Sequence, residues 1–174
     1  MTLRLNGSTS GYVELDAPAV AGTSALTLPS GVGTLLTAEG GKVLQVVRAT
    51  DTTARSTTSA SYVDASISVT ITPVKSTSAI LILWKARFQP ASNQNSRLQI
   101  TDSSNNPISG AEELLFQFGN STVPILEQTL IGYATPATTS AVTYKGRFNI
   151  TGGGTLTINN NSMTGQMFAI EVSA

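Results

Sequence analysis

The chain has 174 residues, its ten basic residues balance ten acidic ones, and only 11% of its residues are charged. This balance argues against nucleic-acid binding, which needs a positive surface, and the apolar runs are far shorter than the roughly 20 residues of a membrane helix. There is no Cys and no His, which excludes thiolate metal sites, Cys-His proteases and Ser-His-Asp hydrolases in their ordinary forms. We therefore expect no catalytic residue, no metal, no cofactor and no membrane insertion.

Residues 1–40 differ in pattern from the rest of the chain. They contain short apolar-alternating pieces separated by Gly, Pro and Ser, which is a strand signal: Leu3–Leu5, Val13–Leu15, Leu26–Leu28 and Val32–Leu36. So few apolar residues do not offset an ordering cost of roughly 1–2 kcal/mol per residue. We therefore expect an extended N-terminal β-arm that is held by copies of the same chain or by a larger assembly. The candidate anchor residues are Leu3, Leu5, Tyr12, Val13 and Leu15.

Residues 41–174 contain longer strand patterns. From Ser66 to Thr72 apolar and polar residues alternate strictly, which predicts a strand with one buried face, and Pro73 ends it. The run Ile80–Trp84 is apolar at every position, as in a strand that is covered on both faces. Beyond Trp84 the run returns to alternation and ends near Phe88.

Further strands follow at regular intervals. Residues Leu98–Ile108 predict a hairpin with its turn at Asp102–Pro107. Alternation recurs in three later groups: Leu114, Phe116 and Phe118; Val142, Tyr144, Phe148 and Ile150; and Leu156 with Ile158. Trp84, Tyr144 and Phe148 are expected in the core or at a subunit seam, and Phe168, Ile170 and Val172 predict a C-terminal core strand. About eight to ten strands and no convincing helix indicate an all-β sandwich, in the form of a jelly roll.

Several stretches resemble tailed-phage (marine and cyanophage-like) tail-fibre and virion structural proteins. Four stretches resemble the C-terminal domain of that group: Ala60–Pro73, Ser76–Ile82, Tyr133–Lys145 and Phe168–Val172. Three stretches resemble its fibre shafts: Gly7–Leu15, Ala17–Gly22 and Leu26–Pro29. The resemblance implies a homotrimer with jelly-roll heads similar to those of tumour necrosis factor and complement C1q. It also implies binding to other virion proteins or to host surface glycans, without catalysis. A typical fibre has a long shaft, whereas this chain has one arm-like segment.

Two motifs have plainer interpretations than the functions that they suggest. Asp102, Ser104 and Asn106 are spaced like calcium-loop ligands, but the later Gly and closing Glu of that loop are missing, so we predict an ordinary turn. Glu112 and Glu113 are adjacent, so in a strand they point to opposite faces and make a poor glycosidase pair. Carbohydrate hydrolysis by carboxylates stays the enzymatic alternative.

The combined prediction is a non-enzymatic protein on the exterior of a phage virion. The shaft-like arm favours a short trimeric tail fibre or receptor-binding protein that is anchored by residues 1–40. The short chain and its neutrality favour the alternative, a trimeric capsid decoration (cement) protein. Because loops on rigid scaffolds carry recognition and amide side chains suit sugar hydroxyls, the candidate recognition residues are Asn93, Gln94, Asn95, Asn105, Asn106, Asn160 and Asn161.

Overall fold

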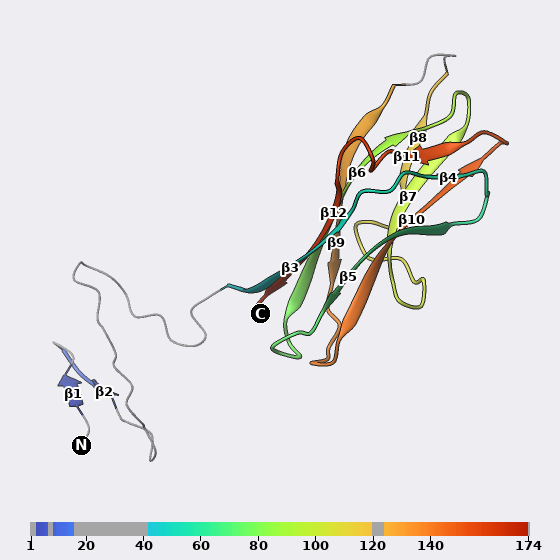
Figure 1. The fold of residues 1–174 in the computed structure, drawn as a ribbon. Helices are drawn as coiled ribbons and strands as arrows, with labels where there is room; N and C mark the ends of the chain where they lie inside the picture. The colour runs from blue at the N-terminus through green and yellow to red at the C-terminus, as the bar shows by residue number, and fades with distance from the viewer. Residues whose placement is uncertain (1–2, 7–8, 16–41, 120–123, 174) are drawn as a thin grey trace. The chain divides into compact units, whose positions relative to one another are not determined.

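The computed structural model describes residues 3–6, 9–15, 42–119 and 124–173 (Figure 1). The chain divides into two compact units, residues 1–35 and residues 36–174, and each is described by itself. The predicted boundary between residues 40 and 41 lies outside the described residues. The same holds for the predicted apolar pieces Leu26–Leu28 and Val32–Leu36.

The first unit contains an antiparallel hairpin of β1 (Leu3–Asn6) and β2 (Tyr12–Leu15). Its register pairs Leu3 with Leu15 and Leu5 with Val13, so the alternating apolar positions share one face of the ladder. An isolated two-stranded hairpin is marginally stable in water. The two strands therefore need further contacts to be stable.

The second unit is an all-β sandwich of two antiparallel sheets, as the sequence predicts, and it contains no helix among its described residues. In the first sheet the order is β3 (Val43–Asp51), β12 (Gly165–Val172), β6 (Ala79–Gln89) and β9 (Leu126–Ala134). Short strands β11 (Leu156–Ile158) and β4 (Arg55–Thr57) extend it beyond the end of β6. The second sheet has the order β5 (Val63–Ile71), β10 (Val142–Thr151), β7 (Asn95–Asp102) and β8 (Leu114–Gln117). The described residues offer no candidate for a membrane-spanning helix.

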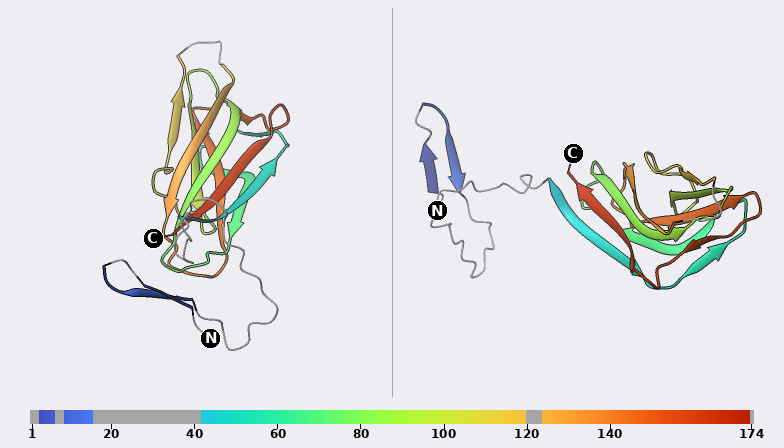
Figure 2. Two further views of the ribbon diagram at one scale, coloured as in Figure 1. Left: turned by 90° about the vertical axis from the view of Figure 1, so that its left-hand side faces the viewer. Right: turned by 90° about the horizontal axis from the view of Figure 1, so that it is seen from above.

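The core lies between the two sheets (Figure 2). Strand β6 sends Ile80, Ile82 and Trp84 into it, and each of these side chains is fully buried. The indole of Trp84 reaches β10 at Gly146, where an added Cβ would lie 2.9 Å from the ring. A glycine therefore occupies this position in the middle of a strand because a side chain would collide with the indole. The predicted aromatic residues Trp84, Tyr144 and Phe148 are all core residues.

Strand β12 corrects one prediction. It is a central strand, but its core face carries Met167 and Ala169, while Phe168, Ile170 and Val172 lie on the opposite face. The register explains the difference, because Met167 pairs with Trp84 and Ala169 pairs with Ile82, and residues paired across strands share a face. Both faces of β12 contain apolar residues, so alternation within the strand does not identify the core face.

Strand β9 was not predicted from the sequence. Its polar stretch Glu127–Thr129 hides the alternation, and only the second half shows a buried face, with Leu130 and Gly132. Gly132 makes room for Ile108, whose Cγ2 would lie 2.9 Å from a Cβ at that position. The chain between β7 and β8 thereby packs against β9 in the other sheet.

A buried carboxylate joins the strands at one end of the sandwich. Glu171 has no exposed surface, and its Oε1 accepts the backbone N–H groups of Val74 at 2.8 Å and Lys75 at 3.2 Å. Its Oε2 accepts from Gln45 Nε2 at 2.6 Å. Burial alone would raise the pKa of Glu171, but these hydrogen bonds outweigh it and hold the pKa below the usual value.

We expect Glu171→Gln to lower the free energy of unfolding by about 1–3 kcal/mol at pH 7, because the amide offers a donor where the fold presents donors. A depressed folded-state pKa stabilises the protein above the unfolded value of about 4.3, and this stabilisation is lost as the pH falls below that value and through the folded-state pKa. Urea denaturation at several pH values should therefore show wild type and variant converging in acid. The exposed Glu112→Gln is the control and should match wild type throughout. An equal gap between wild type and Glu171→Gln at pH 7 and in acid would contradict this account.

Candidate functional site

The outer face of the first sheet is apolar over two neighbouring cross-strand rows. The first row joins Val46, Ile170, Leu81 and Tyr133, and the second joins Arg48, Phe168, Leu83 and Ile131. We call the outer apolar face the set of apolar residues in these two rows: Val46, Leu81, Leu83, Ile131, Tyr133, Phe168 and Ile170. Cross-strand neighbours on one face lie about 4.5–5.5 Å apart, so these residues form one continuous patch.

Much of this face is open in the single chain. Val46 is 56% exposed, Ile131 52% and Tyr133 55%, while Leu81, Leu83, Phe168 and Ile170 are half-buried. Soluble monomers rarely expose contiguous apolar patches beyond a few hundred Å². The strand that the sequence marks as apolar at every position is therefore covered by this chain on its core face, and its other face is part of an exposed apolar surface.

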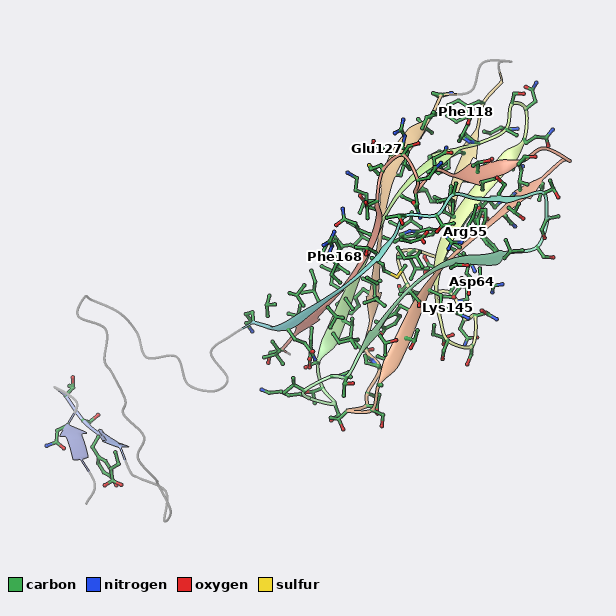
Figure 3. All side chains as sticks on the ribbon, in the orientation of Figure 1. Arg55, Asp64, Phe118, Glu127, Lys145 and Phe168 are labelled. Carbon is green, nitrogen blue, oxygen red and sulfur yellow. The ribbon has the colours of Figure 1, made fainter. Side chains whose placement is uncertain are left out.

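Charged and polar residues border the outer apolar face. Arg48 Nε donates to Gln166 Oε1 at 3.0 Å, and its guanidinium lies 5.9 Å from the ring centre of Phe168. Lys85 Nζ and Glu127 Oε2 form an exposed ion pair at 3.6 Å. In Figure 3, Phe168 and Glu127 lie on one side of the sandwich and Asp64 and Lys145 on the other. The border carries both signs of charge, so it does not exclude a second molecule of the same kind.

The outer face of the second sheet has a different character. Thr70 pairs with Thr143 across the strands, Ser68 with Lys145, and Asp64 with Arg147. The Thr70 and Thr143 hydroxyls are 2.8 Å apart and hydrogen-bonded. Because polar residues follow this face, it suits contact with water, and the two outer faces of the sandwich are chemically unequal.

The predicted recognition residues Asn93, Gln94 and Asn95 lie where the chain passes from β6 to β7. Asn93 is exposed and has a positive φ of 55°. The side chain of Gln94 fills the space beside Gly152 and Gly154. A Cβ added to either glycine would lie 3.0 Å or less from a side-chain atom of Gln94. Asn95 is the first residue of β7 and is half-buried. Of these three side chains, Asn93 is the one freely presented to solvent.

Among the other predicted recognition residues, Asn105, Asn106 and Asn160 bind other side chains of the protein, and Asn161 is exposed. Asn106 Nδ2 donates to Asp102 Oδ2 at 2.8 Å and stabilises its own turn, and Asn105 Oδ1 accepts from Lys145 Nζ at 2.8 Å, which joins the turn to β10. Asn160 is only 2% exposed, and its Nδ2 donates to Asp51 Oδ2 at 2.7 Å. Its neighbour Asn161 is exposed. Asn160 therefore holds the end of β3 and does not face solvent.

The predicted motifs with possible chemistry have structural partners. Asp102 Oδ1 accepts the backbone N–H groups of Ser104 and Asn106 at 2.8 and 2.9 Å, which makes the Asp102–Pro107 segment a side-chain-stabilised turn. Glu113 Oε2 binds Arg97 Nε at 2.8 Å, while Glu112 is exposed. Among the described residues no group of three His, Cys, Asp or Glu side chains is placed to hold a metal ion. For the arm, Tyr12 is 56% exposed, and Leu3, Leu5, Val13 and Leu15 are placed by the hairpin register alone.

The fold and the site together define an all-β sandwich with one apolar and one polar outer face. No family model matches the chain, and no curated protein matches it either. One similar solved chain belongs to the structure of infectious bursal disease virus Gx strain, with 15% identity and a TM-score of 0.25 over 99% of this chain and 47% of that chain. The chain thus spans about half the length of that protein. Similarity at this level carries no argument about function.

The neighbours Asn160 and Asn161 give a matched pair of variants. We expect Asn160→Ala to lower the free energy of unfolding by about 1–3 kcal/mol, because it removes a buried partner of the Asp51 carboxylate. The exposed Asn161→Ala should change it by less than about 0.5 kcal/mol. Urea denaturation of both variants measures the difference, and equal effects would show that Asn160 is not a structural residue.

Proposed function

We propose that the chain is a non-enzymatic structural protein of a phage virion and works as a homotrimer, most simply as a short tail fibre or receptor-binding protein. The observation that carries this proposal is the outer apolar face. Such a surface favours assembly, because burial of apolar area drives association. The number three and the virion location come from the resemblance of the sequence to phage fibre proteins.

The strand order supports a jelly roll as the form of the head. Successive long strands alternate between the sheets, except that β7 and β8 share one: β3, β6, β9 and β12 lie in the first sheet, and β5, β7, β8 and β10 in the second. Two such four-stranded sheets with crossing connections are the arrangement of a double Greek key. A jelly roll is also the fold implied by the resemblance to the head domains of tumour necrosis factor and C1q.

A second copy of this chain is the occupant that we propose for the outer apolar face. The border of that face carries both Lys85 and Glu127, and the whole chain has a formal net charge of zero, so identical copies do not repel one another strongly. A closed ring of three copies joins two different surfaces at each interface. The apolar side chains would then occupy the core of the interface, with Arg48 and Lys85 at its rim.

The arm supports attachment to other virion proteins. The hairpin of β1 and β2 is too small to be stable alone, and its register collects Leu3, Leu5, Val13 and Leu15 on one face. A partner protein that covers this face would stabilise the hairpin and anchor the head at the same time. In this proposal the fibre head meets the host surface, and a host glycan is the receptor class.

Capsid decoration is the second candidate, and the neutrality of the chain favours it. A protein with ten charges of each sign among 174 residues can cover a capsid surface without strong repulsion between neighbouring copies. In both candidates the protein acts by binding. Glu113 is held by Arg97 and lies beside an exposed Glu112, an arrangement that offers no convergent pair for glycoside hydrolysis.

We expect purified full-length protein to have the mass of a trimer at micromolar concentration and Ile131→Glu to have the mass of a monomer. The substitution places a charge in the outer apolar face, where burial without a partner is strongly unfavourable, and Ile131 is 52% exposed in the single chain, so the core is not disturbed. Light scattering coupled to size exclusion measures both masses. Ser68→Glu puts the same charge on the polar outer face and should stay trimeric. A monomeric wild type would contradict the proposal.

The location in the virion separates the two candidates. Gold-labelled antibody against this chain should bind at the tail of intact particles if the protein is a fibre, and over the head if it is a decoration protein. Particles assembled with a chain that lacks residues 1–40 should lose the label, because the arm is the proposed anchor. Labelling of neither structure would contradict a virion role, and unchanged labelling without the arm would contradict anchoring by the hairpin.

A further inference from the structure

A cavity of about 320 Å³ lies where β7 and β9 end and β10 begins. This volume is at the lower end of the range of about 300–1,000 Å³ for ligand pockets, so it suits one small ligand. Its wall combines apolar side chains with hydroxyls and one carboxylate. The residues that line the cavity include Asp102, Ser103, Ile108, Thr135, Pro136 and Tyr144.

Tyr144 contributes a hydroxyl to the wall of the cavity. Tyr144 lies on β10 opposite Asp102 of β7, is only 3% exposed and lines the cavity. Its hydroxyl makes no hydrogen bond to the described residues and is not enclosed by protein atoms, so it is accessible to a molecule in the cavity. Burial, together with the charge of Asp102, raises the pKa of Tyr144 to about 12. The hydroxyl therefore stays protonated and can donate to a ligand.

The carboxylate of Asp102 offers the complementary acceptor. It already accepts from the Ser104 and Asn106 backbones and from Asn106 Nδ2, and a carboxylate has about four acceptor positions, so one position is left. Burial alone would raise the pKa of Asp102, but these hydrogen bonds outweigh it, and the pKa is lowered. The group is therefore ionised at neutral pH.

The other lining groups indicate the class of ligand. No basic side chain is among the described residues that line the cavity, which argues against an anion. Asp102 is the one acidic side chain there, and most of its acceptor positions are occupied, which argues against a metal ion. Hydroxyls from Ser103 and Thr135 and the apolar surfaces of Ile108 and Pro136 complete the wall. A ring with hydroxyls on its edge and an apolar face matches this combination.

We propose that this cavity binds one neutral sugar residue, with Tyr144 Oη donating to one hydroxyl and Asp102 accepting from another while Ile108 and Pro136 pack against the ring. The site lies at the end of β7 away from Asn93–Asn95, so it is distinct from the predicted recognition tip. Its meaning as a receptor site rests on the proposed fibre function, but the binding itself is a property of the sandwich alone.

Saturation-transfer NMR on the purified full-length protein tests the site, with glucose, galactose, N-acetylglucosamine and rhamnose as separate probes. Wild type should bind at least one probe with a millimolar Kd, and Tyr144→Phe should weaken that binding about tenfold, since one hydrogen bond is lost. Ala141→Trp, which fills the cavity from an exposed lining position, should abolish it. Tyr62→Phe removes the same hydroxyl elsewhere in the sandwich and should bind like wild type.

Two outcomes would overturn the inference. One is the absence of saturable binding of every probe by the wild type, and the other is unchanged binding in both Tyr144→Phe and Ala141→Trp. Thermal melting of each variant shows that it is folded, and the two cavity variants act at different positions, so the test does not depend on either one alone. If the protein binds a sugar but no label appears at the tail, the fibre function is contradicted and the sugar site is supported. If label appears at the tail but no sugar binds, the fibre function is supported and the sugar site is contradicted.

Discussion

Strand β6 is apolar on both of its faces, and both the core and the outer apolar face are built around it. Its inward residues Ile80, Ile82 and Trp84 fill the space between the sheets, and Trp84 reaches Gly146 on the opposite sheet. Its outward residues Leu81 and Leu83 stand in rows with apolar residues of β3, β12 and β9. One face stabilises the sandwich, and the other creates a surface that a second molecule can bury.

The two outer faces of the sandwich therefore suit different kinds of contact. The apolar face of the first sheet suits association with further copies, while the polar face of the second sheet, with Asp64, Ser68 and Lys145, stays in water. The buried carboxylate of Glu171 and the pair of Asp51 with Asn160 hold opposite ends of the first sheet. Polar groups inside the sandwich thus fix its ends, and apolar groups outside it form the surface that we propose is buried on assembly.

Local patterns in the sequence predicted the elements in which only one face is apolar. Strict alternation from Ser66 to Thr72 identified β5 and its buried face, which the structure confirms. Alternation did not identify the buried face of β12, because both faces carry apolar residues. It did not identify β9 at all, because the polar stretch Glu127–Thr129 hides the alternation. Nor does it show that Asn160 meets Asp51, because that contact joins residues 109 positions apart. The unpartnered Tyr144 hydroxyl likewise appears only when β7, β9 and β10 are brought together.

The absence of cysteine from the chain allows the most direct test of the assembly account. Ile131→Cys and Ser68→Cys each introduce a single thiol, and both positions are exposed in the single chain. The rate of reaction with a maleimide reports whether another molecule covers the thiol. We predict that Ile131→Cys reacts at least about tenfold more slowly than Ser68→Cys in the native protein and equally fast in urea. Equal rates in the native protein would contradict burial of the outer apolar face between copies.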